Sequence, residues 1–211
     1  RGDYDHAGGA EGLARNMKLE RIILPATESA SEAEKALLRK AKDSFVERAR
    51  AGRKYELDGT VLEIVAVPRL KQGKQSKDEN VKMLMQAKSG NEGSTVVAVK
   101  HGEHSLLFTG DMNASSERLL NNLEQCDVLK VAHHGSKYSS SMKFLEQVQP
   151  KIAVISVGAG NRYGHPHIET LERLASVGSV VLRTDKQGAI KVTFDDEGIK
   201  CYSYIYNPKN F

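Results

Sequence analysis

The chain has 211 residues, of which 39% are hydrophobic and 27% are charged, and its formal net charge is +4. This is enough apolar material for one hydrophobic core, so we expect a single domain over residues 1–211. No stretch approaches the roughly 18 consecutive apolar residues that a membrane-spanning helix needs. A net charge of this size does not by itself predict a nucleic-acid partner, so function has to be argued from motifs.

The first part of the chain predicts short elements and one long helix. Residues 1–9 contain two glycines and predict a loop, which leads into a helix over 11–16 and a buried strand over 21–25. Apolar side chains recur at helical spacing over 30–51, with charged residues on the other faces. This pattern predicts a long amphipathic surface helix.

A basic segment separates the next two expected strands. The strands are predicted over 55–68 and 81–87, and the segment 69–77 between them is rich in lysine. Such a segment is either a solvated loop or a contact for a nucleic-acid backbone.

From residue 94 onward, strands and helices alternate regularly. A hairpin is expected over 94–99 and 104–109, and further strands over 126–132, 152–157, 180–184, 189–194 and 199–204. Helices are expected over 115–123, 141–148 and 168–177. Strands that alternate with helices predict a helix-covered sheet, so the fold class is α/β with an antiparallel component.

Four clusters of ligand-type residues stand at loops or strand ends. The first is DYDH, which brings Asp3, Asp5 and His6 into one loop. Carboxylates and an imidazole this close together are costly unless a cation or hydrogen bonds compensate them. The other interpretation is a structural loop with exposed acids.

The second and third clusters each follow an apolar strand. In FTGD, Asp111 lies beyond a strand end, where it either reaches a ligand or caps the following helix. In AHHGS, His133 and His134 are adjacent. If the strand continued through them, their side chains would point in opposite directions, and only one would reach a metal.

The fourth cluster is RYGHPH, which contributes Arg162, His165 and His167 after another strand. In order, the motifs DYDHAGG, TGD, HHGS and RYGHPH resemble those of the metallo-β-lactamase superfamily. They are most similar to the extramembrane domain of ComEC-type DNA-uptake competence proteins, over residues 1–193. The resemblance implies an αββα sandwich. Family domains begin with several strands before the first motif, so we expect this chain to be N-terminally incomplete.

The resemblance also implies a metal centre. Its predicted ligands are Asp3, Asp5, His6, Asp111, His133 and His134, with Asp111 bridging two metals and one of the two adjacent histidines sufficing. Arg1 replaces the motif's leading histidine. The remaining oxygen-rich set favours Mn²⁺ over Zn²⁺ or Mg²⁺. By contrast, His101 and His104 lie in the hairpin turn at the far end of the strand from Asp111, so we expect them to be surface histidines.

The implied activity is hydrolysis of a DNA phosphodiester during DNA uptake. Asp5 would hold or orient the attacking water, and His165, or alternatively His167, would contact a phosphate oxygen or protonate the leaving oxygen. The expected substrate contacts are Ser136, Arg162 and His167. A ComEC-type protein would add a membrane channel and place the domain at the bacterial cell envelope. The alternatives are a hydrolase of esters or lactones and a DNA-binding module that has lost catalysis.

Overall fold

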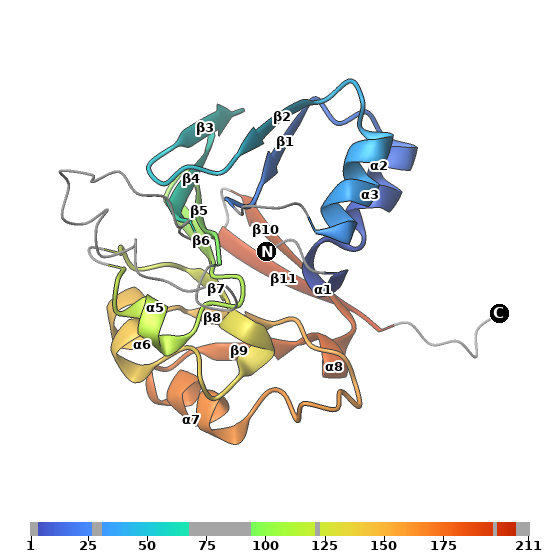
Figure 1. Cartoon of the computed structure of the whole chain (residues 1–211). Helices are drawn as coiled ribbons and strands as arrows, with labels where there is room; N and C mark the ends of the chain where they lie inside the picture. The colour runs from blue at the N-terminus through green and yellow to red at the C-terminus, as the bar shows by residue number, and fades with distance from the viewer. Residues whose placement is uncertain (1–3, 27–30, 68–93, 121–122, 196–197, 206–211) are drawn as a thin grey trace.

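The computed structural model describes residues 4–26, 31–67, 94–120, 123–195 and 198–205 (Figure 1). The expected strand over 81–87 and the basic segment 69–77 lie outside these residues, as do Arg1 and Asp3.

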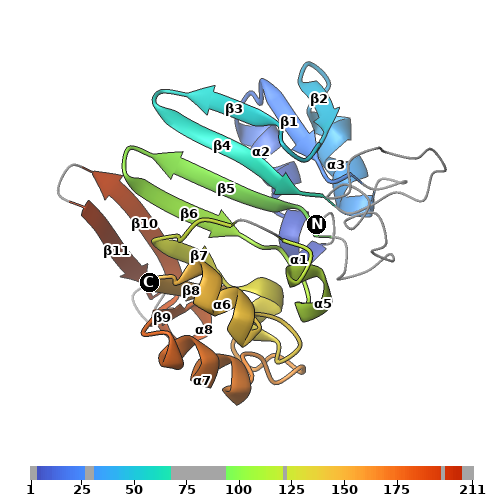
Figure 2. The ribbon, with the colours of Figure 1, turned by 90° about the vertical axis from the view of Figure 1, so that its left-hand side faces the viewer.

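A seven-stranded mixed sheet forms the centre of the molecule (Figure 2). Its strands, in spatial order, are β3 (Lys54–Leu57), β4 (Thr60–Ala66), β5 (Val96–His101), β6 (His104–Phe108), β7 (Val128–Lys130), β8 (Ile152–Ile155) and β9 (Val180–Arg183). Neighbours from β3 to β6 pair antiparallel, and neighbours from β6 to β9 pair parallel. The carboxyl ends of β6, β7 and β8 therefore meet at one edge of the sheet.

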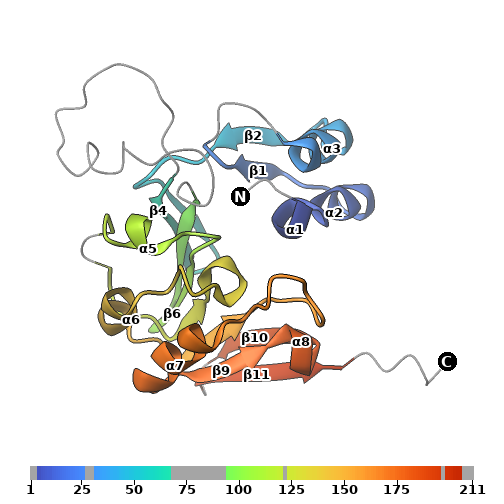
Figure 3. The same ribbon diagram turned by 60° about the horizontal axis from the view of Figure 1, so that its bottom comes forward.

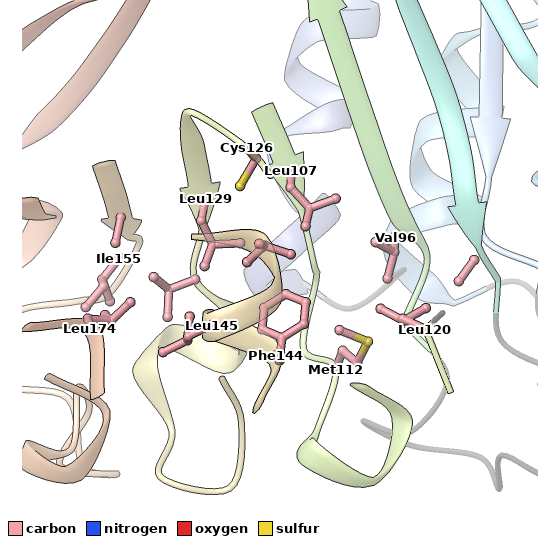
Figure 4. Packing of buried hydrophobic residues seen from close by; sticks show 14 of the residues in the cluster. Val96, Leu107, Met112, Leu120, Cys126, Leu129, Phe144, Leu145, Ile155 and Leu174 are labelled. Atoms are coloured by element: carbon pink, nitrogen blue, oxygen red, sulfur yellow. The ribbon is translucent and has the colours of Figure 1, made fainter. Parts of the chain in front are cut away.

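Helices cover one face of this sheet. They are α5 (Ala114–Glu117), α6 (Met142–Val148) and α7 (Ile168–Ser176). Alternate strand residues such as Leu107, Leu129 and Ile155 point toward them and form the main core with Phe144 and Leu145 (Figure 4). Truncating a fully buried leucine such as Leu145 to alanine would cost about 2–5 kcal/mol of the free energy of unfolding.

The opposite face carries a two-stranded hairpin, β10 (Ala189–Asp195) and β11 (Gly198–Tyr204) (Figure 3). Phe194 of β10 stacks on the imidazole of His104 in β6, with ring centroids 5.5 Å apart. Since Leu107 of β6 points toward the helices, His104 points to the other side of the sheet. The layers are therefore helices, sheet and hairpin.

The N-terminal part has its own small core. It contains α1 (Tyr4–Ala7), α2 (Ala10–Asn16), β1 (Arg21–Leu24), α3 (Glu32–Lys40) and β2 (Phe45–Arg48). Ile22 and Leu24 pack against Leu37 and Ala41, while Ala10 and Ala14 of α2 contact the same cluster. Ser31 caps α3, because its hydroxyl accepts a hydrogen bond from the Glu34 N–H.

The prediction of one helix over 30–51 is wrong. The helix ends at Lys40, and the chain returns as β2, which pairs in parallel with β1. The Phe45 N–H donates to the Glu20 carbonyl at 2.9 Å. Pairing with a strand that lies earlier in the sequence overrides the local helical pattern, and Phe45 and Val46 are residue types that favour strands.

The prediction of one strand over 55–68 is also wrong. The structure forms a hairpin from β3 and β4, with a turn at Asp58 and Gly59. Both turn residues have positive φ, 48° and 74°. The Asp-Gly pair is a turn signal that would have divided the segment.

Most later elements are confirmed with shifted ends. The hairpin, the parallel strands and the two final strands lie where they were expected. The helix expected over 115–123 is shorter and ends at Glu117, while α8 (Thr184–Gln187) was not predicted. Among the described residues, no helix is both long and apolar enough to cross a membrane.

Candidate metal centre

Three loops at the carboxyl edge of the parallel strands form the site. Asp111 follows β6, the 3₁₀ turn η2 (Ala132–Gly135) follows β7, and the segment 156–167 follows β8. Helix α1 lies beside the first of these loops, because the His6 Nε2 atom is 3.0 Å from Asp111 Oδ1. The site is thus built from loops on a buried sheet and one N-terminal helix.

Four of the predicted ligands meet here: Asp5, His6, Asp111 and His134. One ligand atom from each lies within 4.8 Å of all the others. The His134 Nε2 atom is 3.4 Å from Asp5 Oδ2 and 3.7 Å from Asp111 Oδ1. Asp5 has the most exposed side chain of the four, at 59%, and Asp111 is buried, with 2% exposed.

This donor set fits a divalent cation. Two carboxylates and two imidazoles are ligand types shared by manganese and zinc. The His6 Nε2 atom is buried and has no hydrogen-bond partner among the described residues, although a carboxylate oxygen faces it. A buried polar atom without a hydrogen bond is costly, and coordination of a cation would compensate it.

The backbone around Asp111 holds its carboxylate in place. The Asp111 N–H donates to the Ser94 hydroxyl at 2.9 Å. Gly110 precedes it with φ of +55°, and a Cβ atom at Gly110 would lie 2.9 Å from the Ser94 Cβ. The interpretation of Asp111 as a helix cap is wrong, because the cap of α5 is Asn113, whose side chain accepts from the Ser116 N–H.

The electrostatic environment of Asp111 favours its ionised form. Burial by itself would raise the pKa of this carboxyl. The His6 imidazole, by its hydrogen bond and its charge, and the charges of His133 and His134 together outweigh burial, so the pKa of Asp111 lies well below its usual range. The carboxylate is therefore available as a ligand at neutral pH.

The two adjacent histidines lie in a left-handed turn. His133 and His134 have φ of 48° and 54°, and Gly135 has φ of 83°. Because β7 ends at Lys130, the expectation that the two side chains point in opposite directions along a strand does not apply. Left-handed conformations of residues other than glycine cost about 1–2 kcal/mol each, which the surrounding loops must offset.

A hydrogen bond fixes the orientation of His134. Its Nδ1 atom lies 2.7 Å from the Ser156 carbonyl oxygen, which can only accept, so Nδ1 carries the proton. The Nε2 atom then faces the two carboxylates. This is the arrangement that metal-binding histidines commonly show.

His133 lies outside the group of four mutually close ligand atoms. Its ring centroid is 6.3 Å from that of His134 and 5.5 Å from that of His165. His133 therefore borders the site, and its role as a ligand stays a prediction. The same holds for Asp3, which lies outside the described residues.

His165 lies in the third loop, close to the other imidazoles. Its ring centroid is 6.4 Å from that of His134 and 4.9 Å from that of His167. Burial lowers the pKa of His165, and the neighbouring histidines lower it further. His165 is therefore neutral at pH 7 and suited to donate or accept a hydrogen bond.

The Asn161 side chain hydrogen-bonds both backbone groups of His165. This role of Asn161 was not predicted from the sequence. Its side-chain Oδ1 accepts from the His165 N–H at 3.0 Å, and its Nδ2 donates to the His165 carbonyl at 2.7 Å. The next peptide bond, between His165 and Pro166, is cis. An asparagine four residues before the histidine is a weak signal, because asparagine is common in loops.

The Pro166 ring packs against the turn that holds the histidine pair. A Cβ atom at Gly135 would lie 2.5 Å from the Pro166 Cβ. The His167 N–H donates to the Gly135 carbonyl at 3.0 Å. Glycine at this position therefore lets the second and third loops approach each other closely.

The predicted substrate contacts have different surroundings. Ser136 is 2% exposed, and its hydroxyl accepts from the Tyr138 N–H within its own turn. The His167 Nδ1 atom accepts from the Lys137 N–H at 3.2 Å, so a neutral His167 carries its proton on Nε2. Arg162 is exposed beside Tyr163.

Lys130 is a further charged residue near the site. It was not predicted from the sequence. Burial lowers its pKa, and the carboxylates of Asp111 and Asp5 oppose that shift. Its ammonium donates to the Val131 carbonyl at 2.9 Å. The available signal was a lysine within an otherwise apolar strand.

The family is shown by comparison with known proteins. The sequence-family model of the metallo-beta-lactamase superfamily matches residues 2–159, so the chain belongs to this superfamily. Members of the superfamily are generally metal-dependent hydrolases. The match confirms the expected superfamily and the α/β fold class.

Curated relatives show which members of the superfamily the chain is similar to. Over 201 residues the chain is 35% identical to ComE operon protein 3 of Bacillus subtilis (strain 168), and the match covers 91% of this chain and 24% of that protein. It is 37% identical over 131 residues to Competence protein ComA of Neisseria gonorrhoeae, covering 57% of this chain and 19% of that protein. The resemblance to competence proteins is confirmed, and the chain spans about a quarter or less of the length of these relatives.

A solved structure with a similar fold is CmlA, a diiron β-hydroxylase from Streptomyces venezuelae. The TM-score is 0.53 at 10% identity, over 87% of this chain and 40% of that chain. At this identity the similarity extends to the fold alone.

Proposed function

We propose that the chain is a metal-dependent phosphodiester hydrolase that cleaves DNA during DNA uptake, with Asp5, His6, Asp111 and His134 as metal ligands. The observation that carries this proposal is the convergence of these four side chains within 4.8 Å. We further propose that Asp3 and His133 complete the ligand set and that Asp111 bridges two metals.

The chemistry of the donors supports Mn²⁺ over Zn²⁺ or Mg²⁺ as the cofactor. Two carboxylates make the site richer in oxygen than a histidine-only zinc site, while two imidazoles are unusual ligands for Mg²⁺. A bound divalent cation lowers the pKa of a water and polarises a phosphoryl oxygen.

The chain's own residues orient the reactants. The exposed side of Asp5 is free to accept a hydrogen bond from the attacking water, since 59% of its side chain is accessible. A neutral His165 suits a hydrogen bond to a phosphate oxygen better than protonation of the leaving oxygen. His167 offers its Nε2–H, and Arg162 adds an exposed positive charge for the substrate.

The similarity to competence proteins supports DNA as the substrate. The chain covers a small part of these relatives, which supports a role as one domain of a longer protein at the bacterial cell envelope. We propose a membrane channel in the same longer chain as its partner.

The test is cleavage of labelled single- and double-stranded DNA with Mn²⁺, Mg²⁺ or Zn²⁺ added separately. We expect cleavage that is strongest with Mn²⁺ and is lost in Asp5→Ala. Asp43→Ala, which removes another exposed acid, serves as the matched control. DNA binding without cleavage under every metal would instead indicate a binding module, and cleavage of a chromogenic ester alone would indicate an ester hydrolase.

A further inference from the structure

Two exposed tyrosines stand on the loops that carry the histidines of the site. Tyr138 is 68% exposed and follows the turn of His133 and His134, and Tyr163 is 63% exposed and precedes His165 by two residues. Neither takes part in the chemistry described above. Large exposed aromatic side chains beside a site are candidates for binding a ligand.

Tyr163 begins a row of stacked rings that leads toward the metal ligands. Its ring centroid is 5.8 Å from that of His165, with 26° between the planes. The His165 ring stacks in turn on His134, at 6.4 Å and 22°. The exposed Tyr163 ring therefore stands at the outer end of a row of rings that reaches the metal ligand His134.

Each tyrosine is paired with a cation from the preceding residue. The Arg162 guanidinium lies 5.2 Å from the Tyr163 ring centroid, and the Lys137 ammonium lies 5.5 Å from that of Tyr138. An aromatic face beside a positive charge matches a ligand that combines planar rings with anionic groups. An ester with an apolar acyl group would not use these charges.

The two aromatic positions are linked through the histidines. The Lys137 N–H donates to His167 Nδ1, and the His167 ring centroid is 4.9 Å from that of His165. Tyr163 stacks beside His165, and Tyr138 follows Lys137, whose N–H binds His167, so the two tyrosines belong to loops that meet at this pair of imidazoles.

We propose that Tyr138 and Tyr163 form a base-stacking subsite for unpaired nucleotides beside the metal centre, with Lys137 and Arg162 at neighbouring phosphates. This inference rests on the proposed nuclease function and names the form of the substrate. The faces of bases are available for stacking only in single strands, since a duplex buries them. The subsite therefore selects single-stranded DNA, without base-specific hydrogen bonds.

Binding measurements test the subsite without cleavage. Fluorescence anisotropy with Ca²⁺ in place of the cleaving metal would compare a single-stranded oligonucleotide, an abasic oligonucleotide of the same length and a duplex. We expect the single strand to bind about tenfold more tightly than the abasic strand, and Tyr163→Leu to reduce that difference. Tyr163→Phe should keep it, because phenylalanine retains the stacking face. The matched control is Tyr202→Leu, which removes an exposed tyrosine on β11.

Equal binding of normal and abasic strands by the wild type would overturn the proposal. So would Tyr138→Leu and Tyr163→Leu variants that both bind the single strand as the wild type does. Cleavage of bis(p-nitrophenyl) phosphate by the wild type, a phosphodiester without bases, tests the proposed function separately. If this compound and DNA both stay intact under every divalent metal while the tyrosine-dependent binding persists, the nuclease proposal fails and the stacking subsite stands.

Discussion

His6 lies near the start of the sequence and Asp111 near its middle, yet the His6 Nε2 atom lies 3.0 Å from Asp111 Oδ1. His6 belongs to a four-residue helix that buries no side chain, whereas Asp111 is fixed at the edge of the central sheet. Packing alone therefore holds α1 weakly, and contact with the site supplies part of its anchoring. A cation bound between the two residues would stabilise the folded state by mass action.

Removing the imidazole of His134 should abolish high-affinity metal binding. His134→Ala deletes one of four ligands while leaving the turn backbone intact, so we expect Mn²⁺ affinity to fall by at least about tenfold. Isothermal titration calorimetry would measure it. His101→Ala is the matched control, because His101 is exposed in the β5–β6 turn and hydrogen-bonds Thr60. Equal losses in both variants would contradict the ligand assignment.

Substituting alanine at Gly135 should destabilise the protein and displace the loop that carries His165. The added Cβ would lie 2.5 Å from the Pro166 Cβ at a residue with φ of +83°. We expect a loss of about 2–4 kcal/mol in the free energy of unfolding, measured by chemical denaturation.

Gly102→Ala separates the steric clash from backbone strain. Gly102 also has positive φ, +56°, but its Cβ would meet nothing within 4 Å. We expect this variant to lose only about 1 kcal/mol. Equal losses at the two positions would mean that the contact with Pro166 contributes nothing.

Asn161→Asp should reduce cleavage without reducing metal affinity. The substitution removes the amide donor to the His165 carbonyl and keeps an oxygen that can accept from the His165 N–H. We expect kcat for DNA cleavage to fall by about tenfold, since His165 would lose its fixed position. An unchanged kcat would show that the loop holds His165 without this side chain, and a loss of Mn²⁺ affinity would assign Asn161 to the metal site instead.

Acid should weaken the fold partly through Asp127. Burial would raise the pKa of Asp127, but the Lys151 ammonium at 2.6 Å and the Ser105 N–H at 2.9 Å lower it below the ordinary value of 3.8 for an aspartate. The stability that this group contributes is therefore complete above that value and is lost as the pH falls through the depressed pKa. In Asp127→Asn, the decline of unfolding free energy between about pH 5 and pH 2 should be shallower than in the wild type. A parallel decline would contradict this role.

The sequence predicted the part of the site that depends on local patterns. An apolar strand followed by glycine and an acid, or by paired histidines, indicates the carboxyl edge of a parallel sheet, and this pattern pointed to Asp111 and to the pair His133 and His134 without deciding between the two histidines. The stacking of Tyr163 and His165 was not predicted, because it depends on the path of the backbone within the third loop.

The missed features depend on contacts between distant segments. The pairing of β2 with β1 overrides a helical pattern that is real in the residue spacing. The left-handed turn at His133 and His134 has no local signal before Gly135, because neither histidine requires positive φ. The approach of α1 to Asp111 likewise joins distant parts of the chain.

We propose that Asp5, His6, Asp111 and His134 form the metal centre of a DNA hydrolase. This proposal is tested most directly by titrating metal-free protein with Mn²⁺ while electron paramagnetic resonance measures bound Mn²⁺ and a labelled single-stranded oligonucleotide reports cleavage in the same sample. The account predicts that the cleavage rate rises in proportion to bound Mn²⁺ and that Asp5→Ala loses cleavage. Cleavage that persists in Asp5→Ala or in metal-free protein would contradict it.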